Sequence, residues 1–225
     1  MLKLLEDPTP ARRLRDALEP SGSLVSSYVP AGFAFYARIL NPVVVEWSAE
    51  RIPWTTAAAS LGAPLHPWMQ WDEVALAAGP GLPREWSEPA MGDPDESVAQ
   101  ALVEVLARHT STPANCYFAH WDGYGGPQVH DDRRVVFPPD RAMLSYSGPI
   151  DAGVCVIGGD TFGPGPGRRA ERWWPEDLGW CVGQDIYARS LLVGCSAAAL
   201  QDLFSHPALD IISVRASDAV LAEDF

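Results

Sequence analysis

The stretch WCVGQDIYARSLLVGCSAAALQDLFSHPALDIISVR, residues 180–215, decides the fold that the sequence predicts. Two runs rich in β-branched, aromatic and aliphatic residues, 180–186 and 191–195, are separated by only four residues. A helix is predicted to begin after Ser196, which fits the N-cap position, and Pro207 stops it before a third strand at 211–215. Strands that follow one another so closely are typical of antiparallel pairing rather than of a βαβ crossover.

The rest of the chain repeats this mixture of elements. Further strands are expected at 33–40, 43–47, 116–121 and 142–146, and further helices at 9–18, 71–78 and 94–109. The turn dipeptide Asn41-Pro42 lies between two extended runs and predicts a β-hairpin. We therefore expect an α+β fold, a mixed and largely antiparallel sheet with three to four helices packed on it. Residues 1–225 are expected to form a single globular domain, with a split into two lobes near residue 113 as the alternative.

The helix expected at 94–109 has the clearest signals. Asp93 fits the N-cap, Pro94 the first helical position, and Glu96 completes a capping box. Apolar residues then recur at helical spacing, so Leu102 and Val105 are expected to be buried.

Composition excludes several classes of protein. The formal net charge of −13, from 29 acidic and 16 basic residues, repels a polyphosphate backbone, so we expect no nucleic-acid partner. We expect no signal peptide, because Glu6 and Asp7 follow Leu4 and Leu5 at once. No uninterrupted apolar run of membrane-spanning length occurs in the sequence, and the four cysteines are widely spaced. The expected location is the cytoplasm, without a membrane partner. The oligomeric state does not follow from the sequence.

No motif for a metal, a cofactor or a catalytic nucleophile is recognisable. The five histidines form no HxH, HxxxH or HExxH spacing, and no GxSxG occurs. The glycine-rich run 158–167 followed by Arg168 and Arg169 could hold an anion, but it matches neither a Walker motif nor GxGxxG, and a surface loop is the favoured interpretation. We therefore expect no metal, no cofactor and no catalytic residues.

Nine tryptophans and one acidic strand residue supply the candidate site. Aromatic rings beside carboxylates suit a planar or sugar-like ligand, although most tryptophans are expected to fill the core. Asp185 lies inside a strand-like run, so a buried ion pair with Arg38 or Arg141 is expected. The candidate ligand- or partner-binding residues are Trp121, Asp122, Tyr124, Trp173, Trp174 and Asp185.

Four blocks carry a resemblance to a known family. They are YVPAGFAFYARILNPV (28–43), YFAHWDGYG (117–125), WWPEDLGWCVGQDI (173–186) and VGCSAAALQDLFSHPALD (193–210). In these blocks the chain resembles a family of uncharacterised actinobacterial proteins, which carries no assigned activity and therefore implies no catalytic residue. At the level of fold analogy, the W-P-x-D-x-x-W strand also resembles small acidic immunity and regulatory domains of bacteria.

Two functions are therefore expected. The first is a non-catalytic binding or regulatory protein, similar to an immunity protein, whose acidic surface meets a basic protein partner. The alternative is a small-molecule enzyme or ligand-binding protein with a pocket lined by Trp and Tyr and one carboxylate. A deep aromatic cleft containing a carboxylate would favour the second function, and a flat acidic face would favour the first.

Overall fold

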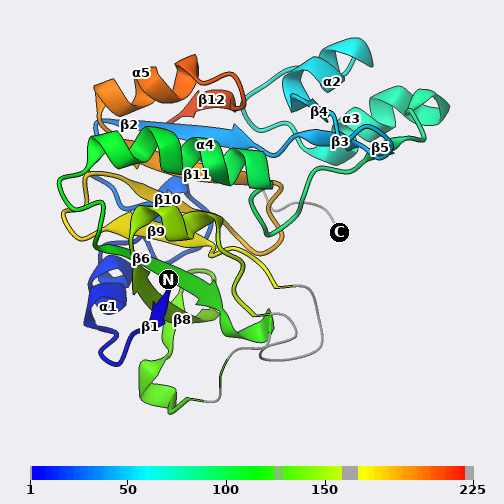
Figure 1. The fold of residues 1–225 in the computed structure, drawn as a ribbon. Helices are drawn as coiled ribbons and strands as arrows, with labels where there is room; N and C mark the ends of the chain where they lie inside the picture. Colours follow the sequence, from blue (N-terminus) through cyan, green and yellow to red (C-terminus); the bar gives the residue numbers. More distant parts are fainter. Residues whose placement is uncertain (1, 125–126, 128, 159–166, 221–225) are drawn as a thin grey trace.

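The chain folds around one large antiparallel sheet, seen in the computed structural model, which describes residues 2–124, 127, 129–158 and 167–220 (Figure 1). Nine strands form it in the order β1-β8-β6-β9-β10-β11-β2-β12, with β7 paired to β8. The strands are β1 (Lys3–Leu4), β2 (Phe35–Leu40), β6 (Cys116–Trp121), β7 (Val135–Phe137), β8 (Arg141–Gly148), β9 (Arg172–Pro175), β10 (Cys181–Gly183), β11 (Ser190–Cys195) and β12 (Asp210–Val214). The expected α+β fold with a largely antiparallel sheet is confirmed.

Different helices cover the two faces of this sheet. The helices α4 (Glu96–Leu106) and α5 (Ala197–Ser205) pack on one face, together with the short helical turn η6 (Ile150–Val154). The helix α1 (Thr9–Asp16) and the turn η1 (Val25–Ser27) pack on the other face. Since neighbouring strand residues alternate between faces, each strand contributes side chains to both cores. The sheet includes strands from both sides of residue 113.

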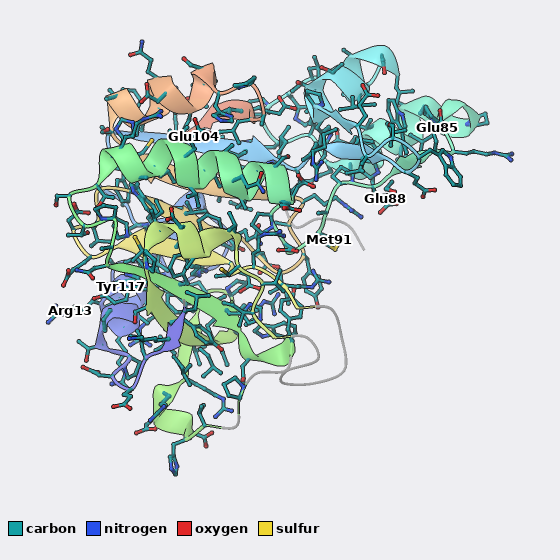
Figure 2. The ribbon with its side chains drawn as sticks, in the orientation of Figure 1. Arg13, Glu85, Glu88, Met91, Glu104 and Tyr117 are labelled. Carbon is teal, nitrogen blue, oxygen red and sulfur yellow. The ribbon has the colours of Figure 1, made fainter. Side chains whose placement is uncertain are left out.

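A small lobe, residues 43–87, projects from the end of β2 (Figure 1). Its three-stranded sheet has the order β4-β3-β5, and its own core contains the edge-to-face pair Trp54 and Trp71. Its elements are β3 (Val43–Val45), β4 (Arg51–Ile52), α2 (Trp54–Ser60), α3 (Trp71–Ala78) and β5 (Trp86–Ser87). Figure 2 shows Glu85 on this lobe, and Glu88 and Met91 on the segment by which the chain returns to the main sheet.

Two local predictions were wrong. Asn41-Pro42 is not a hairpin turn, because β2 and β3 belong to different sheets. The Asn41 side chain is buried, donates to the carbonyls of Ala90 and Asp93 and accepts from the Asp95 amide, which directs the chain out of the main sheet. The second error concerns α4, which begins after Asp95 rather than after Asp93, since Asp95 accepts the Ser97 amide as N-cap.

Three other local predictions, one each for α5, α3 and β6, are confirmed. The Ser196 cap of α5 is confirmed by its bond from the Ala199 amide. The bounds expected for α3 and β6 are those observed.

Substitution of Leu102 in α4 tests the core between α4 and the sheet, because the Leu102 side chain is fully buried there. Leu102→Ala should lower the free energy of unfolding by about 2–5 kcal/mol through lost burial and a residual cavity. Arg108→Ala is the control, since its ion pair with Asp202 is exposed and contributes little. Urea melts that give the two variants equal midpoints would contradict this packing.

Candidate functional site

One cross-strand row on the α1 face of the sheet carries two buried arginines. Opposite residues in neighbouring strands share a face, and the register places Arg172, Gly183, Leu192 and Arg38 side by side on β9, β10, β11 and β2. The two arginines are 0% and 2% exposed, and three strand spacings, roughly 14 Å, separate them. A buried guanidinium must find hydrogen-bond acceptors, so the partners of each arginine shape the surroundings of the row.

Arg172 takes its partners from two loops. Its Nη1 donates to the Tyr28 carbonyl at 2.6 Å, and its Nη2 donates to the Pro138 carbonyl at 2.7 Å. Its guanidinium also lies over the rings of Tyr28 and Phe137. Burial lowers the pKa of the Arg172 guanidinium. This one side chain therefore holds both the η1 segment and the turn between β7 and β8 against the sheet.

Tyr28 sits directly on the strand at Gly183. A Cβ atom at Gly183 would lie 2.2 Å from the Tyr28 carbonyl oxygen, so only glycine permits this approach. The Tyr28 hydroxyl donates to the Gly22 carbonyl at 3.0 Å. Burial and the nearby Asp185 carboxylate raise the pKa of Tyr28 to about 12, so the phenol stays neutral.

Arg38 holds a third segment. Its Nη1 donates to the carbonyls of Pro67 and Met69 at 2.9 and 3.0 Å, and its Nε donates to Ser190 Oγ at 2.9 Å. Its guanidinium lies 5.6 Å from the centre of the Trp68 ring. The segment of the small lobe that precedes α3 is thereby fixed over the end of the main sheet.

The three held segments enclose a cavity of about 310 Å³. Leu192 and Ser190 form its floor on β11, Tyr28 and Pro139 line one side, and Trp68 lines the other. The walls are mainly apolar and aromatic, which is typical of sites for small organic molecules.

A partly exposed ion pair also lines this cavity. Arg141 Nε lies 3.3 Å from Asp185 Oδ2, and Arg141 Nη2 lies 3.5 Å from Asp185 Oδ1. Asp185 also accepts the Tyr187 amide at 3.0 Å, and the Arg141 guanidinium lies over the Tyr187 ring. Of the two partners expected for Asp185, the structure selects Arg141. Both contacts are longer than the usual distance of about 2.7–2.9 Å for a charge-assisted hydrogen bond.

A second polar row lies on the opposite face of the same strands. Backbone hydrogen bonds extend β9 and β10 by one residue, so that His120, Glu171 and Gln184 are neighbours. His120 Nδ1 is 3.5 Å from Glu171 Oε2, which also accepts the Trp121 amide at 2.9 Å. All three side chains are buried, and the Gln184 carboxamide has no hydrogen-bond partner among the described residues.

Tyr124 packs beside this row. Its ring packs edge-on against Trp121 at 4.9 Å and lies 5.5 Å from the His120 ring. Burial raises the pKa of Tyr124 to about 12, with further contributions from the carboxylates of Glu171 and Asp185. Of the predicted candidates, Trp121 and Tyr124 therefore pack against each other, whereas Asp185 lines the cavity.

The other candidates lie elsewhere. Asp122 forms an ion pair with Arg134 at 2.7 Å. Trp173 and Trp174 are buried on opposite faces of β9, against Phe118 and Tyr117 respectively. The structure does not gather them in one cleft with Trp121 and Tyr124, because β9 is a central strand whose faces are both covered.

Sequence reasoning missed most of the cavity. Tyr28, Trp68, Tyr187 and Arg172 were not among the candidates. The sequence signal that could have identified Arg172 is a charged residue inside a strand-like run, which predicts a buried charge in need of a partner. The same signal was used for Asp185. Most of the glycine-rich run itself, residues 159–166, lies outside the described residues.

Comparison with known proteins adds no relative. No protein-family model, no curated protein and no solved structure matches this chain. The resemblance to an actinobacterial family therefore stays a prediction. No helix among the described residues is long and apolar enough to cross a membrane. Within the same residues, no three His, Cys, Asp or Glu side chains are grouped to hold a metal ion.

Arg38 offers a test of how the cavity is assembled. Arg38→Met keeps much of the apolar stem but leaves the carbonyls of Pro67 and Met69 without this donor, so unfolding should become easier by about 2–3 kcal/mol. Arg108→Met, at an exposed position, should change stability by less than about 0.5 kcal/mol. Equal urea midpoints for the two variants would show that Arg38 does not hold the small lobe.

Proposed function

We propose that this protein binds a small organic molecule in the cavity between Tyr28 and Trp68. One observation carries the proposal: an aromatic, mainly apolar cavity of about 310 Å³ contains a partly exposed carboxylate and guanidinium, those of Asp185 and Arg141. This is the combination of apolar walls and a few polar groups by which small-molecule sites fix orientation. Aromatic walls beside a carboxylate are also the feature that was expected to favour ligand binding over a flat acidic docking face, although these walls are formed by Tyr28 and Trp68 instead of the predicted tryptophans.

The polar groups of the cavity favour binding over chemistry. Ser190 Oγ accepts a hydrogen bond from Arg38, and Asp185 is engaged by Arg141. No imidazole lines the cavity among the described residues, and its carboxylate, that of Asp185, is held by Arg141. We further propose that the protein works in the cytoplasm, since Cys116, Cys155, Cys181 and Cys195 are all free thiols.

A blocked cavity tests this function. Ala188 lines the cavity, and Ala188→Trp should fill part of it. The fluorescent probe anilinonaphthalene sulfonate should bind the wild-type protein with one site per chain, and this variant should weaken binding by about tenfold or more, as expected for loss of a buried apolar contact.

Phe204→Trp is the matched control, because Phe204 is half exposed on α5, on the opposite face of the sheet. It should leave probe affinity unchanged. Probe binding that survives in Ala188→Trp, or that falls equally in both variants, would contradict the proposed function.

A second candidate function, docking of a basic protein partner, is favoured by the turn between β3 and β4. Trp47 at this turn is 87% exposed, which is unusual for tryptophan. Glu46 and Glu50 flank it and are exposed, and the Glu46 amide bonds the Glu85 carbonyl, which places a third acidic residue beside the turn (Figure 2). An exposed ring amid carboxylates suits lysine and arginine side chains.

Removal of Trp47 tests this second function. An arginine-rich peptide should bind the wild-type protein in a salt-dependent manner, and Trp47→Ser should weaken binding by about threefold to tenfold, the range expected for a cation–π contact. Phe204→Ser removes another exposed aromatic residue and should have no effect. Equal binding by both variants would show that the turn is not the docking point.

A further inference from the structure

The charge at the cavity has the opposite sign to that of the whole chain. The chain carries a formal net charge of −13, yet the described residues that line the cavity include two guanidinium groups, those of Arg38 and Arg141, and one carboxylate, that of Asp185. Guanidinium groups gathered at one place are electrostatically costly unless a counter-charge offsets them, because like charges repel strongly at low dielectric.

Arg172 supplies a positive charge that its direct partners do not neutralise. Both of its hydrogen-bond acceptors are neutral carbonyls, those of Tyr28 and Pro138, and its Nε has no partner among the described residues. Asp185 attracts Arg172 from a distance, and Glu171 does so more weakly. The Arg172 guanidinium lies over the Tyr28 ring, which lines one side of the cavity. The positive charge of Arg172 therefore acts on a ligand in the cavity through this ring.

Arg141 has the capacity to bind a further anion. Its guanidinium carries five donor hydrogens, and its contacts with Asp185 at 3.3 and 3.5 Å use only Nε and Nη2. Nη1 makes no hydrogen bond to any described residue. Arg141 is 22% exposed and lines the cavity, so a ligand can reach it without displacing the floor or the walls.

From these observations we infer that the ligand is a small organic anion, with a planar apolar body against Tyr28 and Trp68 and its anionic group bound by Arg141. The inference rests on the proposed function of the cavity and adds the chemical class of the ligand. A carboxylate, sulfonate or phosphate would each accept two parallel bonds from the guanidinium. Asp185 competes with that group for Arg141 and thereby limits the affinity.

Two probes that differ only by one charge test the inference. Anilinonaphthalene sulfonate carries the same rings as phenylnaphthylamine, which is neutral. The wild-type protein should bind the sulfonate about tenfold more tightly or better, the gain expected for a charge-assisted hydrogen bond. Arg141→Met should remove this preference while changing the affinity for the neutral probe by less than about twofold.

Two further variants separate charge from folding. Arg141→Lys retains the positive charge and should retain part of the preference for the sulfonate. Asp185→Asn removes the competing carboxylate and should strengthen sulfonate binding. Thermal melts establish that every variant is folded at the temperature of the binding measurement. The preference of the wild-type protein for the sulfonate should shrink as ionic strength rises.

The outcomes distinguish this inference from the function on which it rests. If both probes bind wild type equally, or if Arg141→Met weakens both equally, the anionic ligand class is wrong, while blockage by Ala188→Trp still upholds a binding cavity. If neither probe is affected by Ala188→Trp, the proposed function fails and this inference fails with it.

Discussion

The structure depends on two guanidinium groups buried in one row on one face of the sheet. Neither Arg172 nor Arg38 can reach bulk water, and an ionised group taken out of water is strongly destabilising unless it is hydrogen-bonded. The acceptors recruited are carbonyl oxygens of Tyr28, Pro138 and the segment 67–69, which belong to three separate loops. The same bonds that satisfy the arginines therefore position the walls of the cavity.

The residues between the two arginines in the row, Gly183 and Leu192, determine the shape of the cavity floor. Gly183 lets Tyr28 approach the strand, and Leu192 presents an apolar surface next to it. The chain leaves β10 at this point, and Asp185 follows at the edge of the cavity beside Arg141. The register of the sheet thus forms an apolar floor, and the ion pair of Asp185 and Arg141 lies at its edge. Glu171 lies on the other face of the sheet, and its carboxylate and that of Asp185 both contribute to the raised pKa of Tyr124.

Local sequence signals were sufficient to predict several helices and strands. The features that could not be predicted depend on contacts between residues far apart in the chain. The Ser196 cap and the bounds of α3 and β6 depend on residues within a few positions, so they were predictable. Asn41 looked like a turn residue, but its side chain bonds residues about fifty positions away, and that pairing sends the chain into a second sheet. A partner for Asp185 was correctly expected, but the reason was wrong, because β10 ends at Gly183 and Asp185 is half-buried outside the strand; only the fold selects Arg141.

The role of Arg172 was beyond sequence reasoning for the same reason. It follows a glycine-rich run and looks like an exposed basic residue, yet it begins a central strand and its acceptors lie at Tyr28 and Pro138, far away in the chain. Trp173 and Trp174 were misleading because adjacent aromatic residues in a strand face opposite cores when both faces are covered.

The most direct measurement is a crystal structure of the protein with bound anilinonaphthalene sulfonate. The account predicts that the rings lie over Leu192 between Tyr28 and Trp68, with a sulfonate oxygen within hydrogen-bonding distance of Arg141. Rings bound elsewhere on the protein, or a sulfonate that points to solvent away from Arg141, would contradict it.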